Sequence, residues 1–115
     1  MNNTIRATAQ NLLNAARIAR DTLAADRRGD TTVAAFLTLH GCNEAWQSRW
    51  ASAFGHRSAD AYRARHGHQP RQIWQSVNGH ATRVYCYPLA DVDLLRDAWI
   101  HYDARRITPA RQLAA

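Results

Sequence analysis

The sequence predicts a mainly helical single domain with one β-hairpin. Three observations lead to this fold class: segments with apolar residues three and four positions apart, an Asn-Gly pair between two alternating segments, and a glycine or proline that ends each segment. A chain of 115 residues, 46% of them hydrophobic, is long enough for one core and too short for two independent domains. We therefore look for one function.

Residues 1–29 are expected to form an N-terminal helix that Gly29 ends. One stripe of this helix is apolar, with residues spaced alternately by four and three: Ile5, Ala9, Leu12, Ala16, Ala19 and Leu23. We expect the stripe to pack on the chain's own domain. Because the spacing also fits a short coiled-coil seam, a homodimer contact through residues 4–27 is the alternative.

Residues 30–107 are expected to form a winged-helix-like body that begins with a short helix. Asp30 or Thr31 is the expected N-cap, the apolar residues include Phe36 and Leu37, and Gly41 is the expected end.

Two further short helices are expected next. Asn43 caps the first, which ends at Gly55, and Ser58 caps the second, which ends at Gly67. The first carries an aromatic stripe that we assign to the core, with a base-stacking platform as the alternative: Trp46, Trp50 and Phe54.

A β-hairpin is expected over about residues 73–87. Asn78 and Gly79 suit the positive φ angles of a type I′ turn, which places Val77 opposite His80 and Ile73 opposite Val84. Pro70 also suits the first position of a helix, so the sequence leaves open whether residues 70–77 are mainly helix or strand.

The last helix follows Pro88. Asp91 is its expected N-cap, and an amphipathic pattern defines its buried stripe: Val92, Leu95, Trp99 and Tyr102. Residues 108–115 are expected to form a frayed tail.

The charge of the chain is positive and uneven. The net charge is +6, and all fifteen basic residues are arginines, which suit phosphates and guanine edges. Residues 43–88 hold six arginines against Glu44 and Asp60, a net of +4. This distribution favours an anionic partner, most simply nucleic acid.

Short helices followed by a two-stranded hairpin are the order of a winged helix-turn-helix domain. The segment "YPLADVDLL" resembles the junction between wing and helix in MerR-like and excisionase-like regulators, at Tyr87, Asp91, Val92 and Leu95. Residues 54–102 also resemble small winged-helix proteins and antirepressors of phages and plasmids. Tyr85 departs from the arginine usual in MerR-like proteins, and no effector-binding domain follows residue 103.

The resemblance implies a protein that binds duplex DNA, as a small transcriptional regulator or accessory factor of a mobile element. The residues expected to contact DNA are arginines of the basic segment and polar residues of the hairpin: Arg57, Arg63, Arg65, Arg71, Gln72, Gln75, His80 and Arg83.

The alternative is a small interaction protein of phage type that inhibits a host nuclease or repressor. It would use exposed tryptophans as anchors, drawn from Trp46, Trp50, Trp74 and Trp99. One contiguous basic face favours DNA as the partner, whereas exposed tryptophans among dispersed arginines favour a protein.

An enzyme, a cofactor and a metal site are not expected. The chain lacks a glycine-rich phosphate loop, and no pair of Cys or His has the spacing of a zinc module. A nucleophile and base such as Cys86 and His80, on facing or neighbouring strands, would be a coincidence of two common residues. We expect a cytoplasmic protein with reduced Cys42 and Cys86 and no membrane span.

Overall fold

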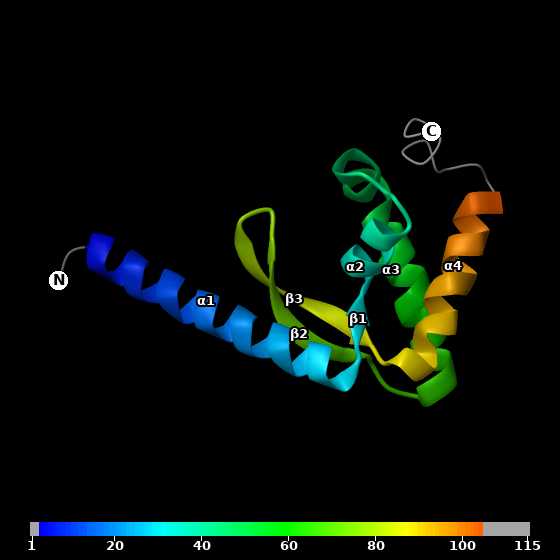
Figure 1. The fold of residues 1–115 in the computed structure, drawn as a ribbon, viewed down its shortest axis with the longest axis horizontal. Coiled ribbons are helices and arrows are strands. Elements are labelled where there is room, and N and C mark those ends of the chain that lie inside the picture. Colours follow the sequence, from blue (N-terminus) through cyan, green and yellow to red (C-terminus); the bar gives the residue numbers. More distant parts are fainter. Residues whose placement is uncertain (1–2, 105–115) are drawn as a thin grey trace.

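The computed structural model describes residues 3–104 and shows a mostly helical chain with a small antiparallel sheet (Figure 1). The elements follow one another in this order: α1 (Asn3–Arg28), β1 (Thr31–Thr32), α2 (Val33–Leu39), α3 (Glu44–His66), β2 (Arg71–Val77), β3 (His80–Tyr87), a 3-10 turn (Leu89–Asp91) and α4 (Val92–Ala104). The three strands lie in the order β1-β3-β2. The expected class, mainly helical with one hairpin, is confirmed, and the sheet has one strand more.

The hairpin has the register that its turn predicts. Asn78 has a φ of 54° and Gly79 a φ of 80°, and Val77 lies opposite His80 while Ile73 lies opposite Val84. Residues 71–77 are strand throughout, which resolves the ambiguity at Pro70. Pairing along the whole of β3 satisfies the backbone of this segment, which a single helical turn could not do.

Strand β1 was not predicted, and it changes how α2 begins. Thr31 and Thr32 pair with Tyr87 and Cys86 of β3. The N-cap of α2 is Thr32, whose Oγ1 accepts a hydrogen bond from the N–H of Ala35 at 3.2 Å. The expectation of Asp30 or Thr31 as N-cap was wrong, because both residues lie before or within the new strand.

Helix α3 corrects the expectation of two short helices. Asn43 caps it and Gly67, with a φ of 75°, ends it, but the helix continues through Gly55. A Cβ on Gly55 would lie 4.0 Å from Cγ2 of Val33, so α2 packs closely against this position. Ser58 is fully buried inside the helix and caps nothing. Packing against neighbouring elements therefore outweighs the local cost of glycine, about 1 kcal/mol.

The main core lies between the helices and the end of β3. It contains two residues of the predicted aromatic stripe, Trp46 and Phe54, with Trp50 packed against them, so the assignment of this stripe to the core is confirmed. Leu95 and Trp99 of α4 join the same core, as expected. The side chain of Tyr102 and the tail after Ala104 lie outside the described residues.

Helix α1 packs on the sheet with the face opposite to the one predicted. Its Ala25 forms a small second core with Ile73 and Cys86, and Asp21 Oδ2 accepts a hydrogen bond from the N–H of Trp74 at 2.7 Å. That bond satisfies a backbone donor on the outer edge of β2. The helix therefore packs on its own domain as expected, but the apolar stripe from Ile5 to Leu23 is exposed and does not take part.

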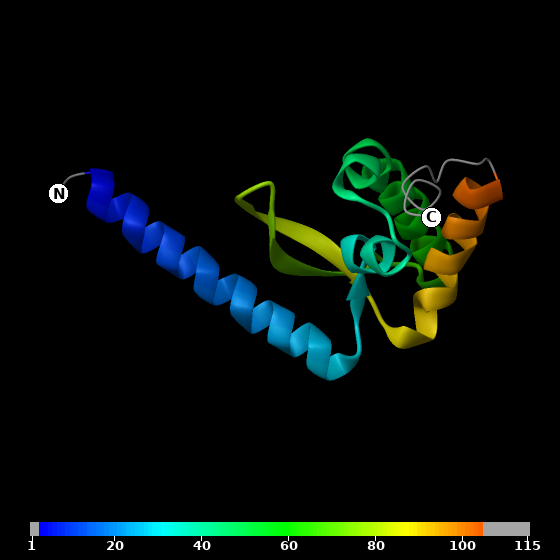
Figure 2. The same cartoon turned by 45° about the horizontal axis from the view of Figure 1, so that its top comes forward.

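The N-terminal half of α1 extends away from the body, and the hairpin lies between α1 and the α2–α3 pair in both views (Figures 1 and 2). No helix in residues 3–104 has the length and apolar character that a membrane span requires. Cys42 and Cys86 are both buried and form no disulfide.

Tyr87 offers a test of this core. Its side chain is fully buried, its hydroxyl has no hydrogen-bond partner among the described residues, and burial raises its pKa to about 12. We expect Tyr87→Phe to keep the melting temperature or raise the free energy of unfolding by about 1 kcal/mol, because an unsatisfied buried hydroxyl is removed. As a control, Tyr85→Phe removes a hydroxyl that donates to Gln69 Oε1 at 2.8 Å, so this variant should not raise the free energy of unfolding.

The stability difference between Tyr87→Phe and the unmodified chain should also depend on pH. Since the raised pKa keeps the folded phenol protonated, the contribution of Tyr87 is complete below its ordinary pKa of about 10 and is lost as the pH rises through about 12. Thermal melts between pH 9 and pH 12, at steps chosen about one unit apart, should show a smaller loss of stability for Tyr87→Phe than for the unmodified chain. Parallel losses would contradict the assigned burial.

Candidate nucleic-acid interface

Helices α2 and α3 are joined by a short turn, and the residues of this turn fix how the two helices meet. Gly41 has a φ of 79°, which lets the chain reverse between the two helices. The side-chain amide of Gln47 donates to Thr38 Oγ1 and to the carbonyl of Cys42, each at 3.1 Å. Gln47 therefore ties the first turn of α3 to both α2 and the connecting turn, and sets the angle between the helices.

The N-terminal half of α3 presents a polar face to solvent. Arg49, Ser52 and His56 are exposed and follow one another at spacings of three and four, so they share one side of the helix. The guanidinium of Arg49 lies 5.2 Å from the ring centroid of Trp50, which restricts its motion. This face offers one permanent charge, one hydroxyl and one imidazole to a ligand.

The tip of the hairpin lies across a groove from this half of α3. The groove has a volume of about 670 Å³. Small and polar side chains from α2, α3 and the hairpin turn line it, among them Thr38, Ser48 and Asn78, and the carboxylate of Glu44 belongs to the same lining. Ser52 is the residue of the polar face that belongs to this lining. The hairpin tip and the α2–α3 pair therefore face one common space.

A second pocket, with a volume of about 520 Å³, lies beside Arg71. That second pocket is lined by residues of several elements, among them Arg28, Asp30, His68 and Cys86.

The residues predicted on the hairpin lie on both of its faces. Directly paired residues share a face, so Arg71, Gln75 and His80 lie on the side of Ile73, while Gln72 and Arg83 lie on the opposite side. Gln75 also lines a pocket with Asp26 and Asp30, next to carboxylates that would repel a phosphate. The hairpin therefore does not bring these five residues onto one surface.

Arg83 takes part in a cation–π cluster. Its guanidinium lies 5.3 Å from the ring centroid of Trp74, and that of Arg17, from α1, lies 5.7 Å from the same ring. The cluster places two positive charges where α1 meets the hairpin, and it holds both side chains in place.

Two of the predicted arginines of α3 lie near carboxylates. Arg57 is exposed and lines a shallow pocket with Asp60 and Asp97, on the side of α4. Arg63 forms an ion pair with Asp60 and donates to Gln69 Oε1 at 2.8 Å. Arg57 lies on another side of the helix, whereas Arg63 continues the spacing of the polar face but has its guanidinium paired with Asp60.

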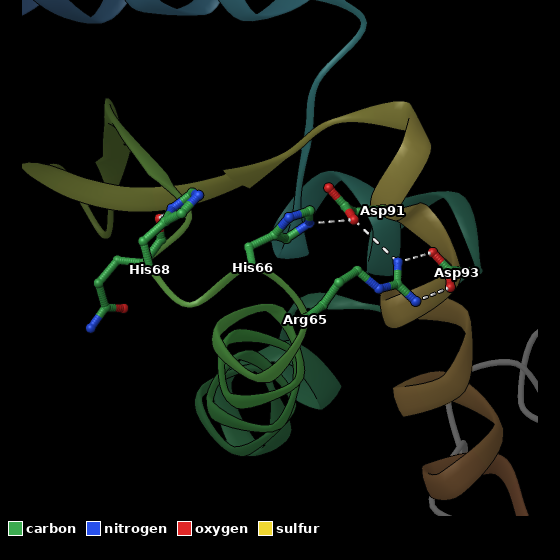
Figure 3. Close-up of polar contacts among 6 residues, drawn as sticks. Arg65, His66, His68, Asp91 and Asp93 are labelled. Atoms are coloured by element: carbon green, nitrogen blue, oxygen red, sulfur yellow. Dashed lines mark hydrogen bonds and ion pairs between the residues drawn. The ribbon is translucent and has the colours of Figure 1, made fainter.

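Arg65 joins α3 to the start of α4 (Figure 3). It donates to Asp91 Oδ1 at 3.1 Å and to both carboxylate oxygens of Asp93, at 2.9 and 2.6 Å. His66 lies 2.8 Å from the same oxygen of Asp91, which is buried. Asp91 directly precedes α4, at the position predicted for the N-cap. Its carboxylate, however, accepts from Arg65 and lies against His66.

These contacts shift the charge equilibrium of the cluster. The hydrogen bonds that Arg65 donates lower the pKa of Asp93, and the same bonds, to Asp93 first and then to Asp91, raise the pKa of Arg65. Since Arg65 is neutralised by two carboxylates, its role in the fold is that of a clasp between α3 and α4.

The arrangement around Cys86 does not form a nucleophilic site. Burial raises the pKa of the Cys86 thiol, which donates to Asp30 Oδ2 at 3.6 Å. His80 lies at the other end of β3, so the two residues do not meet. Within residues 3–104, no group of three His, Cys, Asp or Glu side chains is placed to hold a metal ion.

Comparison with known proteins gives no relative. No family model matches the chain, and no curated protein or solved structure is significantly similar to it.

The polar face of Arg49, Ser52 and His56 was not predicted from the sequence. The expected DNA contacts began at Arg57, and the expected helix ended at Gly55. The 3-4 spacing of these residues opposite the tryptophan stripe was the signal that could have found them.

Arg65 allows a test of the clasp. We expect Arg65→Ala to lower the melting temperature by about 5 °C or more, because it leaves the buried Asp91 without its arginine. Arg57→Ala is the matched control, an exposed arginine on the same helix for which we expect little change. An unchanged melting temperature for Arg65→Ala would contradict the clasp.

The effect of Arg65→Ala should also depend on pH. Because the pKa of Asp93 is lowered in the folded state, its contribution is present above its ordinary pKa, about 3.9, and is lost as the pH falls further. The difference in melting temperature between Arg65→Ala and the unmodified chain should therefore narrow on acidification from neutral pH.

Proposed function

We propose that this protein binds duplex DNA as a winged-helix-like module, with the N-terminal half of α3 in the major groove and the hairpin against the backbone. The observation that carries the proposal is the common space that the α2–α3 pair and the hairpin tip face, a groove of about 670 Å³. An α-helix fits the major groove, and a hairpin beside it suits the adjacent phosphates.

The order of elements supports the proposal. A short strand precedes the α2–α3 pair, the hairpin follows it, and all three strands share one sheet in the order β1-β3-β2. Helices followed by a hairpin are the order expected of a winged-helix-like domain, and β1 adds a third strand that was not part of that expectation. In this chain, α1 lies outside the main core, and α4 packs on α3 within it.

The proposed contacts differ from those expected from the sequence. Arg49, Ser52 and His56 would face the bases or phosphates, with Asn78 of the hairpin tip across the groove. Arg63 and Arg65 are left out of the proposed interface because carboxylates occupy their guanidinium groups. The role that fits such a module is that of a small regulator or accessory factor.

The tryptophans bear on the alternative of a protein that inhibits a host factor. Trp46 and Trp99 are buried, and Trp50 and Trp74 are half-buried, so none of the four is an exposed anchor. The arginines, however, are dispersed over several faces. The absence of exposed tryptophans favours DNA over this alternative.

A salt series tests the proposal. We expect binding to random duplex DNA to weaken with salt with a log-log slope of about −3 or steeper, as three or more phosphate contacts require. Arg49→Ala should weaken binding by about tenfold at fixed salt. Arg96→Ala is the matched control, an exposed arginine on α4 that should leave the affinity nearly unchanged.

Two results would overturn the proposal. One is the absence of binding at low salt, and the other is an equal loss of affinity in Arg49→Ala and Arg96→Ala.

A further inference from the structure

The apolar stripe of α1 lies on the solvent side of the helix. All six of its residues are exposed, and its larger members are Ile5, Leu12 and Leu23, with exposed fractions of 56%, 68% and 51%. Leu13, beside the stripe, is exposed as well. An exposed apolar surface of this kind marks an interaction site more often than a free surface.

The opposite face of α1 packs on the sheet. Asp21 and Ala25 hold this face to the edge of β2, and Ile18, which is half-buried, lies on the same side. The stripe therefore remains available while α1 keeps its place on the sheet. Its alternate spacing of four and three has an average period of 3.5 residues, which is the repeat of a helix that pairs with another helix.

We propose that the stripe binds the same stripe of a second copy, so that two α1 helices pair antiparallel. In antiparallel pairs, the two kinds of seam position face each other. One register matches all six residues at once: Leu12 faces Ala16, Ala9 faces Ala19 and Ile5 faces Leu23. A large residue lies over a small one next to the twofold axis.

The position of Leu13 supports a second copy of the chain as the partner that covers the stripe. In this register Leu13 lies beside the axis and faces the Leu13 of the other copy, which accounts for an apolar residue outside the seam. In a parallel pair, Ala9, Ala16 and Ala19 would each face their own copies and leave three thin layers, whereas the antiparallel register leaves two, both between Ala9 and Ala19.

The shape of the chain leaves room for this pairing. The N-terminal half of α1 extends beyond the hairpin in both views, and residues 4–13 are all exposed (Figures 1 and 2). In an antiparallel pair this half lies along the C-terminal half of the other α1. A projecting helix that is marginal alone gains packing in this way.

The charges beside the seam make the pairing sensitive to salt in a particular direction. Arg6 and Arg20 each follow a seam residue, and in the proposed register Arg6 faces Arg20 of the other copy. Salt screens this repulsion and leaves the apolar contact intact. Association should therefore strengthen as salt increases, whereas binding to DNA weakens.

Sedimentation velocity of the full chain at tens of micromolar, in low and high salt, tests the dimer. We expect a dimer that is tighter in high salt, and Leu12→Asp should raise the dimer Kd by about a hundredfold or more, because each dimer carries the change twice. Leu39→Asp, at an exposed leucine of α2, is the matched control and should leave the Kd unchanged. Circular dichroism melts check that both variants fold.

A monomer in high salt, or equal dimers from the unmodified chain and Leu12→Asp, would overturn the proposal. An increase in association only on addition of an acidic helical peptide would assign the stripe to another partner and would also overturn it. These outcomes do not depend on DNA, so failure here is distinct from failure of the proposed function.

Cross-linking tests the direction of the helices. A mixture of Ala9→Cys and Ala19→Cys chains should form a disulfide between the two variants on oxidation, and Ala9→Cys alone should not. The unmodified chain, whose two cysteines are buried, is the control. Cross-linked dimers of Ala9→Cys alone would contradict the antiparallel register.

Discussion

The alternation of two consecutive residues of β3 fixes the arrangement of the whole chain. Cys86 and Tyr87 are both buried and point to opposite faces of the sheet. Cys86 packs with Ala25 of α1 and Ile73 of β2, and Tyr87 enters the core of α2, α3 and α4. A shift of one residue in the register of β3 would exchange these two environments. The positions of α1 and of the helical core therefore depend on one strand.

The hairpin takes its position from the same strand. The ladder between β2 and β3 continues without interruption from Arg71 to the turn, so the tip is a direct extension of the buried end of β3. Because Gln47 fixes α3 relative to α2, both sides of the groove at the tip are held by ordered contacts. The groove is thus a consequence of the fold and not of a loose loop.

Local chemistry made the hairpin and the helix ends predictable from the sequence. Asn78-Gly79 fixes the turn and the register of the hairpin. Asn43 caps the start of α3 and Gly67 ends it, and both depend only on residues close in sequence. Strand β1, the continuity of α3 through Gly55 and the packed face of α1 depend on contacts distant in sequence. Among the expected DNA contacts, Arg65 shows the same limit, because its partners Asp91 and Asp93 lie more than twenty residues further along the chain.

The central claim is that the N-terminal half of α3 and the hairpin tip form one DNA-binding surface. Backbone amide chemical shifts, measured by NMR during titration with a short DNA duplex, test it most directly. The account predicts the largest changes around Arg49, Ser52 and His56 of α3 and around Asn78 at the hairpin tip, with small changes on α4. Changes confined to α4 or to the exposed stripe of α1 would contradict it.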